Sequence, residues 1–179
     1  MRGLGLFLPL AAALLAPGAA HARDAAELAC PTAGFSAGDA ATFASAVAEQ
    51  APHTDSRFAD FRAALAACRE RLGWSEEIAD VARMHALGIS GAEEMRRRLA
   101  ASGIDAAPFE REILDDGALI AAGGQGFPEP EMEALLRRVM PRIEALAADH
   151  PDIDVPTMMG NFIAFRAIAA AMELRFTAG

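Results

Sequence analysis

The segment VPTMMGNFIAFRAIAAAMELRF, residues 155–176, decides the fold. Apolar side chains such as Met159 and Phe162 occupy most sides of a helix drawn through this segment, rather than one narrow stripe. A helix that is apolar nearly all round is typical of a core position, where neighbouring helices cover it. The sequence therefore predicts a central core helix over these residues.

Three polar residues in this segment, Asn161, Arg166 and Glu173, argue against a membrane span. A charged side chain in the middle of a bilayer is costly, so such a helix fits better inside a folded domain. We expect Arg166 to form a buried or interfacial ion pair with an aspartate or a glutamate. If the helix were exposed instead, we would expect a homodimer.

The remainder of the chain also predicts helices, because alanine, leucine, arginine and glutamate dominate it and no segment alternates apolar with polar residues. We expect a compact all-α bundle of about six to eight helices, forming a single domain over residues 23–179. Outside residues 73–105 we expect a helix at about 40–50 with a cap at Asp39, and a second from a cap at Thr54 or Asp55 to Leu72. We expect a further helix from Pro108 or Phe109 to Ile120 with a break at 115–117, and a long helix at 129–149 that Pro141 kinks or divides.

A pattern of glycine, apolar residue and capping residue recurs every 15 residues, as Gly73-Trp74-Ser75, Gly88-Ile89-Ser90 and Gly103-Ile104-Asp105. Glycine often ends a helix in the left-handed conformation, and serine or aspartate often begins the next one. We therefore expect three tight turns between short helices, with Ser90 starting a capping box. The glycine-rich segment 123–126 predicts a further loop.

Residues 1–22 have the three parts of a secretory signal peptide. Arg2 provides a positive charge, residues 4–15 are apolar, and Ala20-His21-Ala22 is a small-x-small cleavage site. The apolar stretch is too short for a stable transmembrane helix. We expect cleavage near Ala22 and a mature protein without a transmembrane anchor, in the periplasm or secreted.

The chain has two cysteines, Cys30 and Cys68. An even number of cysteines in an exported protein predicts a disulfide, because the compartments outside the cytoplasm are oxidising. We expect a bridge between them that attaches the N-terminal segment to a helix. Glu27 stands where a lipoprotein cleavage motif needs an apolar residue, which argues against a lipid anchor on Cys30.

The formal net charge of −9 at pH 7 disfavours nucleic acids and anionic lipid surfaces as partners. A basic exported protein fits better as a partner than an acidic one. All 16 basic residues are arginines and tyrosine is absent, which excludes catalysis by a lysine amine or a tyrosine hydroxyl. The sequence contains no motif for a serine nucleophile or for a cofactor, and we expect neither.

One set of residues could hold a metal ion. Imidazoles and carboxylates together can bind zinc or another divalent cation, but no two of these residues share a helical face at metal-ligand spacing. The alternative interpretation makes Asp55 a helix cap and residues 149–154 a turn exposed to solvent. The candidate ligands are His53, Asp55, His85, His150 and Asp152.

A second set of residues could bind a partner. Arg96, Arg97 and Arg98 form the densest positive cluster, and Phe162 and Arg166 lie on the apolar C-terminal segment. Arginines recognise carboxylates and phosphates well. The competing interpretation is a solvated helix face on which glutamates three and four residues earlier, at 93 and 94, pair with these arginines.

The leading hypothesis from sequence is an exported, non-enzymatic helical protein that binds another protein or a small apolar ligand. A metal-assisted hydrolase that uses His53, Asp55, His85 and His150 is the first alternative. A structural factor of the cell envelope, with a filled core and one large apolar patch, is the second.

Overall fold

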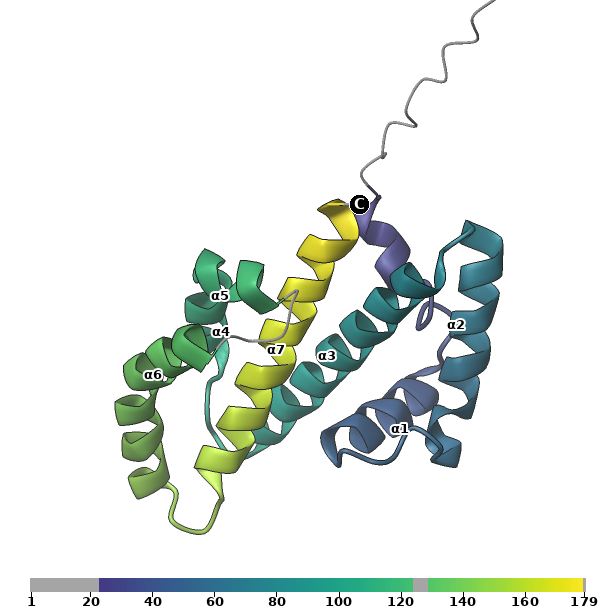
Figure 1. Ribbon diagram of the computed structural model, residues 1–179. Helices are drawn as coiled ribbons and strands as arrows, with labels where there is room; N and C mark the ends of the chain where they lie inside the picture. The colour runs from purple at the N-terminus through teal and green to yellow at the C-terminus, as the bar shows by residue number, and fades with distance from the viewer. Residues whose placement is uncertain (1–22, 124–128, 179) are drawn as a thin grey trace, which may run out of the picture.

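The computed structural model describes residues 23–123 and 129–178, which contain seven α-helices, two short 3₁₀ helices and no strand (Figure 1). The expected all-α bundle is confirmed. The expected signal peptide at 1–22 and most of the glycine-rich loop lie outside the described residues. The elements are η1 (Ala25–Ala29), α1 (Ala37–Ala48), η2 (Ser56–Phe58), α2 (Ala59–Leu72), α3 (Glu76–Ala101), α4 (Ala107–Leu114), α5 (Gly117–Gly123), α6 (Glu129–Asp149) and α7 (Val155–Ala178).

Helix α7 is the central core helix that the sequence predicts. Figure 1 shows it between α3 on one side and the α4, α5 and α6 group on the other. Its side chains Met159, Phe162 and Phe176 are completely buried. By length and composition alone α7 could cross a membrane, but here α3, α4, α5, α6 and η1 all contact it.

Helix α3 is one continuous helix of 26 residues, so the turn and the helix start expected at Gly88 and Ser90 are wrong. A Cβ atom on Gly88 would lie 2.8 Å from the backbone nitrogen of Ala169 and from the backbone oxygen of Phe165. A Cβ atom on Gly91 would lie 2.7 Å from the Phe165 ring. These glycines are therefore needed for the close approach of α3 and α7, and they do not end a helix.

The other two members of the glycine pattern do form turns. Gly73 has φ 64° and ends α2 in the left-handed conformation, and the Ser75 side chain then accepts a hydrogen bond from Ile78 N at the start of α3. Gly103 has φ 79°, and the Asp105 side chain accepts a hydrogen bond from Ala107 N at the start of α4. Both positions are free of tertiary crowding, so the local sequence signal decides the structure there.

The capping residues at α1 and α2 differ in detail from the expectation. Ser36 is the N-cap of α1 and forms a capping box with Asp39, the third residue of the helix. The backbone nitrogen of each residue donates a hydrogen bond to the side chain of the other. Asp55 caps the short helix η2 rather than α2 itself. Farther along, the expected break at 115–117 separates α4 from α5, and α6 continues through Pro141.

The predicted disulfide between Cys30 and Cys68 is present, with 6.1 Å between the two Cα atoms. It attaches the segment after η1 to the C-terminal half of α2. Next to it the Trp74 indole nitrogen donates a hydrogen bond to Glu27, and the Trp74 ring packs edge-on against Phe176 of α7. One core cluster thus joins η1, α2, α3 and α7.

The two glycine environments give opposite predictions for alanine substitution. Gly88→Ala should lower the free energy of unfolding by roughly 1–3 kcal/mol, because the new methyl group meets the backbone of α7. Gly160→Ala is the matched control in α7, where nothing lies within 4 Å of the added Cβ. It should raise the free energy of unfolding by roughly 0.5–1 kcal/mol, because alanine loses less backbone entropy than glycine in a helix. Urea unfolding followed by circular dichroism measures both, and a stabilised Gly88→Ala variant would contradict the role assigned to Gly88.

The disulfide closes a loop with a sequence separation of 38. In the chain-entropy description such a bridge contributes about 4 kcal/mol by restricting the unfolded chain. We expect the double variant Cys30→Ala/Cys68→Ala to keep its helical circular dichroism spectrum but to unfold at a clearly lower urea concentration. Dithiothreitol should lower the midpoint of the unmodified protein and leave the double variant unchanged. An unmodified protein whose midpoint does not respond to reduction would refute the prediction.

Candidate functional site

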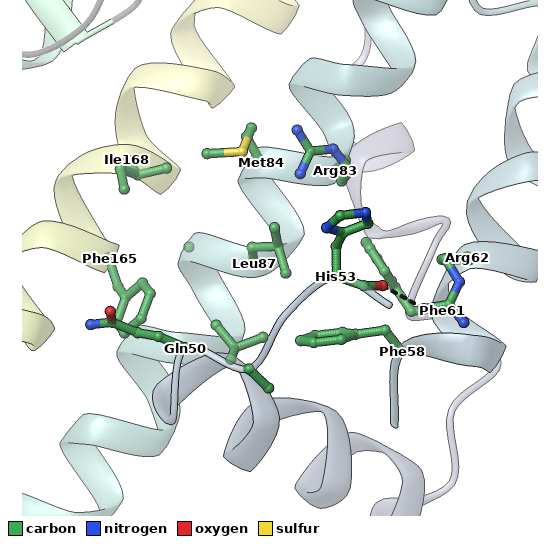
Figure 2. Close-up of a pocket in the computed structure, with 13 residues that line it drawn as sticks. Gln50, His53, Phe58, Phe61, Arg62, Arg83, Met84, Leu87, Phe165 and Ile168 are labelled. Atoms are coloured by element: carbon green, nitrogen blue, oxygen red, sulfur yellow. Dashed lines mark hydrogen bonds between the residues drawn. The ribbon is translucent and has the colours of Figure 1, made fainter. Parts of the chain in front are cut away.

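The main candidate site is a pocket of about 650 Å³ between the α1–η2–α2 region and the α3–α7 pair. Its volume lies within the range of small-molecule sites in proteins. Figure 2 shows the residues around it. They are Val47, Gln50, Ala51, His53, Phe58, Phe61, Arg62, Arg83, Met84, Leu87, Gly88, Phe165 and Ile168.

A cluster of aromatic rings builds the wall on the α1 and α2 side. The Phe43 ring is buried and contacts Phe35, Phe58 and Phe61, with ring centroids between 4.6 and 5.7 Å apart. These contacts hold α1 against η2 and the start of α2. The rings of Phe58 and Phe61 therefore present fixed apolar surface to the pocket.

Helices α3 and α7 build the opposite wall. Met84 and Leu87 come from α3, and Phe165 and Ile168 come from α7. All four side chains are half-buried, so part of their apolar surface is not covered by protein. Phe165 takes its place because its ring lies over Gly91, so the close approach of the two helices also shapes the pocket.

The loop after α1 forms part of the edge. Gln50 has φ 53°, and its backbone nitrogen donates to Val47 O while Ala51 N donates to Ala46 O. This left-handed turn ends α1 and directs the chain toward His53. Asparagine or glycine is more usual at such a position, so glutamine there gives no local signal of a left-handed residue.

The polar side chains of the pocket lie at its edge. In Figure 2 His53, Arg62 and Arg83 lie on one side, and Phe165 and Ile168 lie on the other. Nη1 of Arg62 donates hydrogen bonds to the backbone oxygens of His53 at 2.7 Å and Asp55 at 3.2 Å (not to a carboxylate). None of the described residues that line the pocket is an aspartate or a glutamate.

Arg83 is the second cation at this edge. Its Nε and Nη2 atoms both donate to one carboxylate oxygen of Asp80, at 3.0 and 2.6 Å. Asp80 does not line the pocket and its side chain is 61% exposed. An ion pair this exposed to water contributes little free energy, so Arg83 can exchange this partner for another anion at small cost.

The structure does not gather the metal-ligand candidates of the sequence analysis. Within residues 23–123 and 129–178 no group of three or more histidine, cysteine, aspartate or glutamate side chains could hold a metal ion. His53 lies at the pocket edge, Asp55 caps η2, and His85 is half-buried on α3. His150 and Asp152 lie in the connection between α6 and α7.

The candidate partner-binding arginines are occupied by partners within the chain. Arg97 and Arg98 both bind Glu94, as the competing interpretation expects, but Glu94 is only 6% exposed and does not form a solvated face. The hydrogen bond from Arg97 is the main cause of a lowered pKa of Glu94, and Arg98 adds to it. Arg96 instead reaches Glu110 of α4.

Glu110 is also the partner of Arg166, so the expected ion pair of the C-terminal helix is confirmed. The Arg96 Nη2 and Arg166 Nε atoms each lie 2.8 Å from the same Glu110 oxygen. This group joins α3, α4 and α7. Phe162, the remaining candidate, is completely buried beneath the Arg96 guanidinium, whose carbon is 5.8 Å from the ring centroid.

Sequence reasoning missed the pocket as a site. Phe58 and Phe61 are buried core residues that also line the pocket. No local pattern in the sequence distinguishes this aromatic surface from ordinary core. Nothing in the local sequence pairs it with Phe165, which lies about a hundred residues later.

His85 gives a pH-dependent prediction. Burial is the main cause of its lowered pKa, with Arg166 acting in the same direction and Glu173 in the opposite one. A lowered pKa means that the unfolded state takes up a proton before the folded state does, so stability is lost as the pH falls below about 6.5. His85→Gln should lose less free energy of unfolding between pH 7.5 and 5.5 than the unmodified protein. Equal losses in urea titrations at the two pH values would refute this.

Comparison with protein-family models, with curated proteins and with solved structures finds no match to this chain. Its function is therefore argued from its own residues and their arrangement.

Proposed function

We propose that this protein is an exported, non-enzymatic binding protein that holds a small apolar ligand in the pocket between α1, α2, α3 and α7. The observation that carries the proposal is the lining itself, in which aromatic and aliphatic side chains from four helices and η2 surround about 650 Å³. Ligand sites are typically concave and mostly apolar, with a few polar groups that orient the ligand. The export signal and the oxidised cysteine pair suit a binding protein of the periplasm or the extracellular space.

The contrast with the rest of the interior supports this proposal. On the other side of α7 the core side chains Leu119, Leu135 and Ile143 are completely or almost completely buried. The half-buried Met84, Leu87 and Ile168 at the pocket have apolar surface that no described side chain covers. A ligand that removes this surface from water would gain about 25 cal/mol for each square ångström.

The distribution of exposed apolar residues favours a small ligand over a protein partner. A protein interface usually includes a contiguous apolar patch. The large apolar side chains that are most exposed in the described residues come from four different helices, and none of them lines the pocket. They are Leu72 of α2, Leu114 of α4, Leu136 of α6 and Leu174 of α7.

The proposal is tested with the neutral apolar fluorophore N-phenyl-1-naphthylamine. We expect saturable fluorescence enhancement with the unmodified protein and at least tenfold weaker binding by Leu87→Trp, because the larger side chain occupies the pocket. Leu174→Trp is the matched control on an exposed site of α7 and should bind as the unmodified protein does.

A second variant keeps the test decisive if Leu87→Trp does not fold. Ile168→Trp fills the pocket from α7 instead of α3 and should also weaken binding, and melting curves identify any variant that is unfolded. Two folded tryptophan variants that bind the fluorophore normally, or an unmodified protein that does not bind it saturably, would refute the proposal.

A further inference from the structure

We infer that the ligand of this pocket is an amphipathic monoacid, with an aliphatic chain against the apolar walls and a carboxylate at Arg62 and Arg83. The inference rests on the proposed function, since it specifies the chemistry of the ligand that the pocket binds. Its basis is the composition of the lining, which combines apolar side chains with Arg62 and Arg83 in one site (Figure 2).

The charged side chains of the pocket lining are arginines, although the whole chain is acidic. The chain has a formal net charge of −9 at pH 7, so an anion is repelled from most of its surface. The pocket lining contains two arginines and one histidine, and no carboxylate among its described residues. Asp80 pairs with Arg83 and Asp55 interacts with Arg62 from outside the lining, so a ligand carboxylate would take the place that these carboxylates now share.

Arg62 is available to such a head group. The hydrogen bonds of its Nη1 atom go to backbone oxygens, which fix the guanidinium beside the His53 loop. The side chain is exposed at the edge. The Asp55 carboxylate interacts with it electrostatically but forms its ion pair with Arg57. An arginine held in place by carbonyl groups loses little side-chain entropy when it binds a carboxylate.

Arg83 supplies a second donor group from α3. Its only ion-pair partner in the described residues is Asp80, three residues earlier on the same helix. A ligand carboxylate can compete with Asp80 for the Arg83 guanidinium, because Arg83 is only half-buried. Charge-assisted hydrogen bonds from two arginines would select an acid over the corresponding alcohol.

The apolar part of the site suits a flexible aliphatic chain. The pocket is partly open to solvent, so a chain can lie along it without passing a closed entrance. Phe58, Leu87 and Ile168 provide walls on both sides. Each methylene group that leaves water contributes about 0.8 kcal/mol, so a chain of several carbons supplies the affinity and the head group supplies selectivity.

The test compares dodecanoate with dodecan-1-ol, which have the same chain, as competitors of N-phenyl-1-naphthylamine. In the unmodified protein we expect dodecanoate to bind roughly tenfold more tightly than the alcohol, as one charge-assisted hydrogen bond would provide. Arg83→Gln should remove most of this preference by weakening dodecanoate binding, and should leave the alcohol unchanged. Asp80→Asn should strengthen dodecanoate binding, because it removes the competing carboxylate.

The matched control is Arg69→Gln, an exposed arginine of α2 that lies outside this pocket and gives the same change in net charge. It should leave both affinities unchanged. Arg62→Gln should act as Arg83→Gln does. This substitution also removes the contacts to the His53 and Asp55 backbone. If Arg62→Gln is unfolded for that reason, the Arg83→Gln and Asp80→Asn variants provide the test.

The outcomes separate the inference from the proposed function. If the fluorophore and both competitors fail to bind, the proposed function is wrong. If the fluorophore binds but dodecanoate is not preferred, or if Arg83→Gln and Arg69→Gln have equal effects, the pocket binds apolar ligands without recognising an acid and the inference is overturned.

Discussion

The close approach of α3 and α7 is the contact on which the rest of the structure depends. It is the most extensive helix pair in the described residues, and it requires glycine at 88 and 91 because α7 occupies the space of a side chain there. Overpacking at such a position forces backbone shifts in a close-packed interior. The remaining helices then assemble on the two sides of this pair, with α4–α6 next to α7 and α1 next to α3 (Figure 1).

The pocket follows from how α2 is attached. Its C-terminal half is fixed by the disulfide at Cys68 and by the packing around Trp74. Its N-terminal end is fixed by the aromatic cluster around Phe43. Between these attachments α2 contacts α3 far less than α1 does, and the apolar surfaces of Phe61 and Leu87 face a space that no described side chain fills.

The arginines of the chain differ in whether their ion-pair partners belong to the fold or leave them accessible to a ligand. The three arginines at 96–98 resemble a binding site in the sequence, yet each of them forms an ion pair with Glu94 or Glu110. Buried carboxylates need such partners, because an unpaired charge in the interior is costly. Arg62 and Arg83 are isolated in the sequence but line the same pocket, which makes them the better candidates for an external anion.

The sequence by itself determined the all-α class, the core position of α7, the disulfide, and the turns at Gly73 and Gly103, because composition, periodicity and local capping act within one element. Tertiary structure alone decided that α3 continues through Gly88, although the local pattern there is the same as at Gly73. The physical reason is burial: at Gly88 the backbone of α7 fills the space beside the helix, whereas Gly73 has no neighbour. The pocket was likewise decided by contacts between distant segments, since Phe165 and the residues of the His53 loop have no local signal that joins them.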